Sequence, residues 1–232
     1  MGAPSWLGIG AQRSGTAWFT GLLTQHPEVG LGTNGKKEQQ LLHKVADGRV
    51  PAEDYLALFP DDGVRRGDFS PQYLRHPSAG VVVPRLLPDA PLLVLLRDPV
   101  ERYRSAMRLG VTRGRSQPYP MPINLQTWAG CYADQLAMWE SFVGRDRLVV
   151  MVYEQVHAEP QAAVEAVWAR LGLDPVPLAA VGERSRSSSA EEADWAWPEG
   201  TREALQVLYR PQARRLSDDW GLDVSAWESL SD

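Results

Sequence analysis

The chain has 232 residues, a formal net charge of −5 and a single cysteine, Cys131. This length suits one α/β domain with a full core, and the negative charge argues against a general nucleic-acid binder. One cysteine excludes an intrachain disulfide framework, and no apolar run approaches the ~20 residues that span a bilayer. The first residues lack the basic and apolar pattern of a secretion signal, so we expect none. We therefore expect a cytoplasmic protein with no membrane partner. Arginines greatly outnumber lysines, which is typical of a GC-rich bacterial genome.

Apolar runs bounded by turn residues predict the strands of a sheet. Residues 6–10, 92–96 and 148–153 form the clearest runs, and a weaker one covers residues 64–69. The run "LLVLL" at 92–96 is apolar at every position, as in a parallel strand that is covered on both faces. The strands are therefore expected to form a parallel sheet.

Helical spacing of apolar residues fills much of the chain between and after these strands. Such patterns occur at residues 18–23, 128–143, 164–171 and 205–208. We expect Pro211 to split the last helical region, because proline lacks the backbone N–H group. The alternation of strands and helices predicts an α/β fold, a single P-loop-like domain of residues 1–232 whose central parallel sheet has helices on both faces. In such sheets, ligands bind at the carboxyl ends of the strands.

The stretch "IGAQRSGTAWFTGLLTQHP" resembles a phosphate-binding loop without its lysine. Gly10 and Gly15 have the spacing of the G-x-x-x-x-G-K-[ST] motif, but Thr16 stands at the lysine position and the cation is Arg13. A glycine turn that opens a helix presents free N–H groups and a positive dipole end, and Ser14 adds a hydroxyl donor. The loop therefore predicts an anion site that needs no metal. A purely structural glycine turn is the alternative.

A second anion site is predicted by "LLVLLRDPVERYRSAMR". Arg97 ends the buried strand, so its guanidinium is expected at the carboxyl edge of the sheet. Asp98 is expected to cap the next helix, with Pro99 in its first turn and Glu101 completing a capping box. Ser105 lies two turns further on the same face, so Arg97 and Ser105 can converge on an anion away from the first loop. Alternatively, Arg97 pairs with Asp98 or Glu101, and Ser105 faces solvent.

Together the two motifs resemble those of sulfotransferases that use 3′-phosphoadenosine 5′-phosphosulfate (PAPS). "QRSGTAWFTGLLTQHP" is similar to the first motif of that family, and "RDPVERYRS" is similar to the second. The resemblance implies PAPS as co-substrate, 3′-phosphoadenosine 5′-phosphate (PAP) as product, and Arg97 with Ser105 as ligands of the 3′-phosphate. It assigns the 5′-phosphosulfate to six consecutive residues, Arg13, Ser14, Gly15, Thr16, Ala17 and Trp18.

The resemblance is closest to the heparan-sulfate-type branch of the family. "KKEQQLL" is similar to a stretch of that branch and places Glu38 at its catalytic glutamate. Glu38 is thereby implied as the base that takes the proton from the acceptor hydroxyl, with His43 as the second candidate. Arg13 is implied as the catalytic cation that meets the charge on the leaving 5′-phosphate. Residue type alone instead favours a solvated carboxylate beside Lys36 and Lys37, and only the family position of Glu38 reverses this preference.

The stretch "GDFSPQYLRHP" departs from the branch at one position. Phe69 occupies the place of a functional lysine, which implies an acceptor less anionic than a sulfated sugar chain. We expect a small-molecule hydroxyl acceptor, such as a natural product, beside an aromatic wall of Tyr73, Trp195 and Trp197. The other matches to the branch are Asp68, Ser70, Pro71 and Tyr73.

Two other functions stay open at this level. A P-loop nucleotide or small-molecule kinase would need a lysine beside Gly15 and a magnesium ion, and a non-catalytic PAP-binding module would keep both phosphate sites. The family's C-terminal cofactor loop has a stand-in in "ERSRSSS", with Arg184 or Arg186 as the cation. Because no His/Cys cluster has metal-ligand spacing, we expect no metal. Neither the acceptor nor the oligomeric state follows from the sequence.

Overall fold

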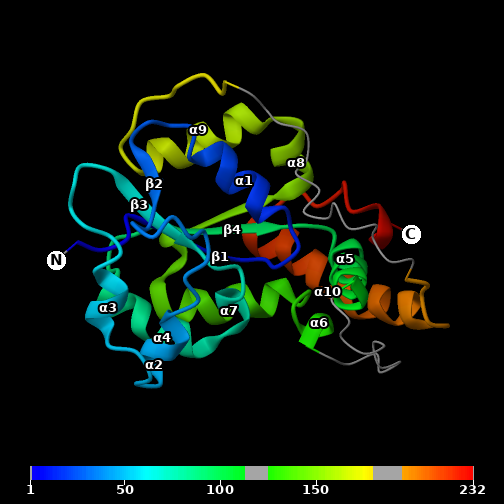
Figure 1. Ribbon diagram of the computed structural model, residues 1–232. Coiled ribbons are helices and arrows are strands. Elements are labelled where there is room, and N and C mark those ends of the chain that lie inside the picture. The colour runs from blue at the N-terminus through cyan, green and yellow to red at the C-terminus, as the bar shows by residue number, and fades with distance from the viewer. Residues whose placement is uncertain (1, 113–124, 180–194, 232) are drawn as a thin grey trace.

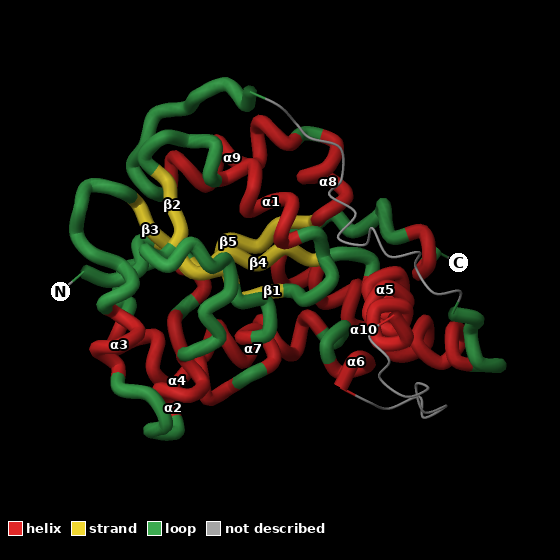
Figure 2. The backbone as a smooth tube through the Cα atoms, viewed as in Figure 1, coloured by secondary structure: helices red, strands yellow, loops and turns green. Residues whose placement is uncertain are grey.

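A five-stranded parallel sheet forms the centre of the computed structural model, which describes residues 2–112, 125–179 and 195–231 (Figure 1). All neighbouring strands run parallel, as the apolar runs predict, and their order in the sheet is β2-β3-β1-β4-β5. Figure 2 shows the strands between two groups of helices. The strands are β1 (Trp6–Gly10), β2 (Val29–Leu31), β3 (Arg65–Phe69), β4 (Leu92–Leu96) and β5 (Leu148–Val152).

Helices cover both faces of the sheet. Helices α1, α8 and α9 lie on one face, and α4 and α7 lie on the other, with α10 beyond them (Figure 1). None of the helices in the described ranges has the length and apolar character of a membrane span. The helices are α1 (Thr16–Leu23), α2 (Leu42–Ala46), α3 (Ala52–Leu56), α4 (Pro77–Leu86), α5 (Pro99–Thr112), α6 (Leu125–Trp128), α7 (Tyr132–Val143), α8 (Tyr153–Ala158), α9 (Pro160–Arg170) and α10 (Thr201–Trp220).

Strand β4 contributes to both cores, which explains why it is apolar throughout. Leu93 and Leu95 pack with α1 and α9, whereas Leu92, Val94 and Leu96 pack with α4 and α7. Successive side chains of a strand point to opposite faces, so a strand covered on both sides needs an apolar residue at each position. The predicted fold class, an α/β sheet with helices on both faces, is confirmed.

The expectation that Pro211 splits the last helix is wrong. Helix α10 continues through Pro211 to Trp220. Both Pro211 and Val207, whose carbonyl loses its helical partner, are exposed, so water can satisfy that carbonyl. The buried face of the helix, which includes Leu205 and Tyr209, is not interrupted.

The helical pattern at 128–143 is divided between two helices, α6 and α7. Gly130 lies in the break, where a Cβ atom would come within 2.6 Å of the Tyr209 ring. The Tyr209 hydroxyl donates a 2.8 Å hydrogen bond to the carbonyl of Thr127. The close approach of α10 therefore interrupts a helix that the apolar spacing predicts as continuous.

Candidate active site

The predicted anion-binding residues lie at the carboxyl edge of the sheet. The glycine loop follows β1, Arg97 follows β4, and Ser70 follows β3. These three strands are neighbours in the order β3-β1-β4, so their ends meet at one edge. This edge is the usual ligand position in open parallel sheets.

The first loop has the geometry of an anion site. Gly15 has a φ of 80°, and a Cβ there would come within 2.4 Å of the Tyr153 ring, so only glycine fits. No side chain caps α1, which leaves its first N–H groups for a ligand. Ser14 is fully buried and its hydroxyl has no hydrogen-bond partner. It lies near the Tyr132 hydroxyl, which donates instead to the carbonyl of Arg97 at 3.0 Å. A buried, unpaired hydroxyl beside free N–H groups fits a phosphate or sulfate.

Ser105 contacts the first loop directly. The Nε and Nη2 atoms of Arg13 donate to Ser105 Oγ at 3.0 Å and 2.8 Å. The expectation that Ser105 serves an anion site away from the first loop is therefore wrong, because the second turn of α5 contacts that loop. Ser105 therefore adjoins the first predicted phosphate site.

Arg97 has the surroundings of a ligand-binding cation. Its guanidinium lies 5.5 Å from the centre of the Tyr153 ring. Within the described residues, it forms no ion pair with Asp98 or Glu101, which was the alternative expectation. Asp98 instead caps α5, accepting from the N–H groups of Val100 at 2.9 Å and Glu101 at 3.2 Å.

The predicted capping box is wrong in one partner. The backbone N–H of Asp98 donates to Glu154 of α8 at 3.2 Å, whereas Glu101 lies 3.8 Å from Arg104. The C-terminal segment adds a clamp, because Ser229 Oγ donates to Asp98 at 2.6 Å and Trp227 Nε1 donates to Glu154 at 3.0 Å. The start of α5 is thus fixed by contacts distant in sequence.

Glu38 is held by two neighbours in its own loop. One carboxylate oxygen lies 3.0 Å from the Lys37 ammonium, and the other accepts from Gln40 Nε2 at 2.8 Å. His43, the alternative base, lies in the first turn of α2 and its ring stacks on that of His76, with ring centres 5.4 Å apart. Burial lowers the pKa of His43 below its usual value, which favours the neutral form of the ring. The structure describes no contact between His43 and Glu38.

A buried carboxylate anchors the loop that carries Glu38. Asp68 accepts from the Gln39 N–H at 3.1 Å, from Ser70 Oγ at 2.6 Å and from the Tyr73 hydroxyl at 3.0 Å. Ser70 Oγ accepts from the N–H of Gln40 at 3.0 Å, and the Tyr73 hydroxyl accepts from the next N–H at 2.9 Å. Side chains of the "DFSPQY" stretch therefore hold the backbone of the Glu38 loop in place through hydrogen bonds.

Asp68 gives a pH-dependent prediction. Burial raises the pKa of Asp68 from 3.8 to about 6, against the hydrogen bonds of Ser70 and Gln39, which lower it. Below about pH 4 its neutral form contributes fully to stability, and this contribution is lost as pH rises through the folded pKa, by about 1–3 kcal/mol. Asp68→Asn should abolish this part of the pH dependence of the free energy of unfolding. Denaturation series for wild type, Asp68→Asn and the exposed control Asp54→Asn would check it; equal pH slopes in all three would contradict it.

The expected aromatic wall does not form as one surface. Tyr73 is fully buried under the Glu38 loop. Trp195 and Trp197 pack instead on Tyr103 of α5, with ring centres 6.2 Å and 6.0 Å away. The two tryptophans stay candidates for an acceptor wall without Tyr73. Arg184 and Arg186, the candidate cations of the C-terminal cofactor loop, lie outside the described residues.

Lys37 also lies at this candidate site, although the sequence motifs do not single it out. Its ammonium lies 3.2 Å from Thr16 Oγ1 of the first loop and 3.2 Å from the carbonyl of Phe69. The sequence contains an indication of this. Thr16 and Phe69 stand where the ATP-type loop and the heparan-sulfate-type branch each have a lysine, and Lys37 directly precedes Glu38.

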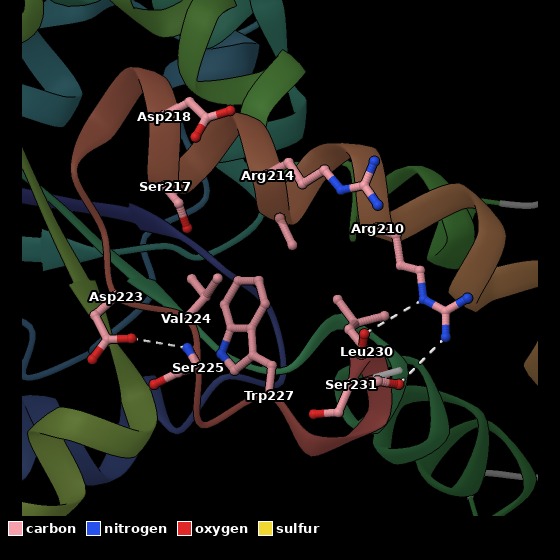
Figure 3. Close-up of a pocket in the computed structure, with 11 residues that line it drawn as sticks. Arg210, Arg214, Ser217, Asp218, Asp223, Val224, Ser225, Trp227, Leu230 and Ser231 are labelled. Atoms are coloured by element: carbon pink, nitrogen blue, oxygen red, sulfur yellow. Dashed lines mark hydrogen bonds between the residues drawn. The ribbon is translucent and has the colours of Figure 1, made fainter.

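A hollow lies between α10 and the C-terminal segment, apart from the candidate site (Figure 3). It has a volume of about 420 Å³ and contains none of the predicted site residues. Arg210 points toward the carbonyls of Leu230 and Ser231, so its guanidinium helps to hold the chain end (Figure 3). In the described part of the chain, no group of three His, Cys, Asp or Glu side chains could hold a metal.

Strand β1 leads through a glycine turn into the uncapped helix α1, and Arg97 follows the neighbouring strand β4. This arrangement is common among α/β proteins that bind phosphorylated ligands. A crystal structure of a sulfotransferase from Alicyclobacillus acidocaldarius has this fold, with a TM-score of 0.79 and 24% identity over 98% of this chain and 100% of that one. A sulfotransferase domain from the curacin biosynthetic pathway matches with a TM-score of 0.56 and 15% identity over 76% of each chain.

Sequence comparisons agree with the fold. The model of the sulfotransferase family matches residues 68–177. The membrane-associated sulfotransferase kil1 of Dictyostelium discoideum is 28% identical over 123 residues, which cover 50% of this chain and 25% of that protein. The mouse bifunctional heparan sulfate N-deacetylase/N-sulfotransferase 4 is 23% identical over 196 residues, 74% of this chain and 22% of that protein. The chain thus spans about a quarter of the length of these relatives. The resemblance to sulfotransferases is confirmed: the chain is similar to members of that family in sequence and in fold.

Proposed function

We propose that this chain, as one sulfotransferase domain of residues 1–232, transfers a sulfuryl group from PAPS to a hydroxyl group of a small molecule. The observation that carries the proposal is the contact between Arg13 and Ser105, with donor–acceptor distances of 3.0 Å and 2.8 Å. It joins the two motifs at one sheet edge, beside the uncapped start of α1. A donor with phosphates at both ends of its ribose suits two adjacent anion sites.

Different residues carry out the binding, charge-stabilising and proton-transfer parts of the proposed reaction. The first turn of α1, with the buried hydroxyl of Ser14, binds the phosphosulfate, and Arg97 binds the 3′-phosphate. Sulfuryl transfer resembles phosphoryl transfer in its loose, in-line transition state, so positioning and charge stabilisation dominate. Arg13 meets the charge that grows on the leaving phosphate oxygen, and Glu38 accepts the proton of the acceptor hydroxyl.

The acceptor class is a further part of the proposal. Phe69 replaces a lysine of the heparan-sulfate-type branch, and the structural neighbour from the curacin pathway belongs to a biosynthetic pathway. Both support an acceptor that is a small, weakly charged metabolite such as a natural product. A bacterial, cytoplasmic origin remains a prediction from the arginine bias and the single cysteine.

A ligand screen tests the proposed function. PAP, PAPS, ATP and NAD are compared for their effect on the unfolding temperature, since a ligand that binds only the folded state stabilises it. PAP and PAPS should stabilise well beyond ATP and NAD, and PAPS should be turned over with 2-naphthol as acceptor. Stronger stabilisation by ATP would favour the kinase, and PAP binding without turnover would favour the non-catalytic module.

We predict that transfer needs no divalent metal. The start of α1, Arg13 and Arg97 supply the positive charge that magnesium supplies in kinases. Turnover of PAPS should therefore be unchanged in excess EDTA, with ADP formation by a magnesium-dependent kinase as the positive control for chelation. Loss of turnover in EDTA and its recovery with magnesium would contradict the prediction.

A further inference from the structure

Two positions where related sites carry a lysine lack one in this chain. Thr16 stands at the lysine of the ATP-type loop, and Phe69 stands at the lysine of the heparan-sulfate-type branch. The two positions lie close together, because β1 and β3 are paired and both end at the ligand edge. One side chain from a third segment, Lys37, reaches both.

The Lys37 ammonium lies between these two positions. Nζ is 3.2 Å from Thr16 Oγ1, 3.2 Å from the carbonyl oxygen of Phe69 and 5.0 Å from the centre of the Phe69 ring. The side chain is only 20% exposed, so most of its stem is covered. Phe69 is part of the core and Thr16 is buried, so the packing around these two partners limits the positions that the Lys37 ammonium can take.

The partners of Lys37 leave it able to bind an anion. Thr16 and Phe69 offer neutral oxygens at 3.2 Å. Among the residues that the structure describes, the one carboxylate that pairs with the ammonium is that of Glu38 at 3.0 Å, and its side chain is one-third exposed. An anionic oxygen would form a shorter, charge-assisted bond and can replace a neutral acceptor. Because the Thr16 hydroxyl accepts from Lys37, its own proton remains to be donated to the same anion.

We propose that Lys37 is a catalytic residue that binds the transferring sulfuryl group, in the place of the lysine missing at Phe69. The inference rests on the proposed function. In the step, the bond between the acceptor oxygen and sulfur forms while the bond between sulfur and the 5′-phosphate oxygen breaks. That phosphate oxygen keeps the electron pair, and Glu38 receives the acceptor proton. The ammonium of Lys37 holds the sulfuryl oxygens so that sulfur stays in line between the two oxygens.

Lys37→Met tests the contact, since methionine keeps the length of the stem and removes the charge. We expect kcat with PAPS and 2-naphthol to fall about 10²-fold, with the dissociation constant of PAP unchanged because PAP has no sulfuryl group. Lys36→Met is the matched control, because Lys36 is the exposed neighbour and its loss changes the net charge equally. Lys37→Gln is the second variant should Lys37→Met fail to fold, and unfolding temperatures are measured for all.

A double-mutant cycle separates direct contact from an effect through Glu38. If Lys37 only positions Glu38, Lys37→Met causes no further loss in a Glu38→Gln background. Direct contact with the sulfuryl group predicts a further loss there.

The alkaline limb of the activity gives an independent readout. Burial lowers the pKa of Lys37 below its usual 10.5, and the carboxylates facing it, Glu38 in its own loop and Asp68 on β3, partly oppose this. The ammonium is lost as pH rises through that pKa, so wild-type activity should fall in this range. Lys37→Arg should retain it, because arginine stays charged. The acceptor here is 2-phenylethanol, which does not itself ionise in this range.

The outcomes distinguish the inference from the function on which it rests. Wild type that neither binds PAP nor transfers from PAPS would overturn both. An active wild type with full kcat in Lys37→Met would overturn the inference alone. A loss of PAP affinity in Lys37→Met as large as its loss of kcat would also overturn the inference, because Lys37 would then contact the phosphate. So would a double-mutant cycle in which Lys37→Met causes no further loss in the Glu38→Gln background.

Discussion

Glu38→Gln is expected to lower kcat by ~10²–10⁴ while PAP affinity remains almost intact. Glutamine keeps the shape of the side chain and its hydrogen bonds but cannot accept the proton of the acceptor hydroxyl. Its carbonyl can still face the Lys37 ammonium, which lies 3.0 Å from the carboxylate. The loop around it is fixed through Asp68, so the substitution should not displace its neighbours.

Two acceptors make the Glu38 measurement decisive. A phenol has an unperturbed pKa near ~10 and needs less help in losing its proton than an aliphatic alcohol. The loss in kcat should therefore be smaller with 2-naphthol than with 2-phenylethanol. Glu53→Gln, on the exposed side of α3, is the control for the removal of a carboxylate.

Other results would reassign the base. An increase in KM for the acceptor with kcat unchanged would make Glu38 a binding residue. Full activity with both acceptors would show that the resemblance is misleading at Glu38. His43→Ala is then the next variant, since the lowered pKa of His43 favours its neutral, proton-accepting form and His43 lies in the first turn of the helix that follows the loop.

The strands that the sequence predicts best are those buried on both faces. The predicted bounds of β1 and β4 agree with the structure, because every residue in them faces a core and must be small or apolar. Strand β2 was missed, since three residues at the sheet edge carry no alternating signal. The errors at Pro211 and Gly130 have one cause. Whether a helix continues through a residue depends on the groups that surround that residue, which are solvent at Pro211 and the Tyr209 ring of α10 at Gly130. Sequence spacing does not indicate these surroundings.

The site shows the same division between local and distant information. The motifs place Arg13 and Ser105 on their own elements, but their contact joins residues 92 positions apart. Tyr73 matches the family motif, yet its hydroxyl serves the Glu38 loop, which motif spacing cannot indicate. Lys37 lies in a loop without periodicity, and only the fold brings it to Thr16. Sequence patterns therefore predict which elements carry the site, and packing decides which side chains meet.

Arg97→Ala is expected to weaken PAP binding by about 1.5–3 kcal/mol, the cost of one charge-assisted contact. Binding of adenosine 5′-phosphosulfate, which lacks the 3′-phosphate, should be nearly unchanged, because Arg97 is assigned to that phosphate alone. Calorimetry with both ligands measures the difference. Arg104→Ala is the matched control, since Arg104 belongs to the same motif and its half-exposed side chain pairs with Glu101.

Ser105→Ala should give a different pattern from Arg97→Ala. Ser105 Oγ accepts hydrogen bonds from two N–H groups of Arg13, at 3.0 Å and 2.8 Å. Its removal therefore takes away a partner of the cation in the first loop, and it also takes away a proposed ligand of the 3′-phosphate. We therefore expect weaker binding of PAP and also a measurable change with adenosine 5′-phosphosulfate. Equal losses for the two ligands in Arg97→Ala would contradict its assignment to the 3′-phosphate. A Ser105→Ala profile identical to that of Arg97→Ala would show that the contact with Arg13 does not persist when the donor binds, and that Ser105 then serves the 3′-phosphate alone.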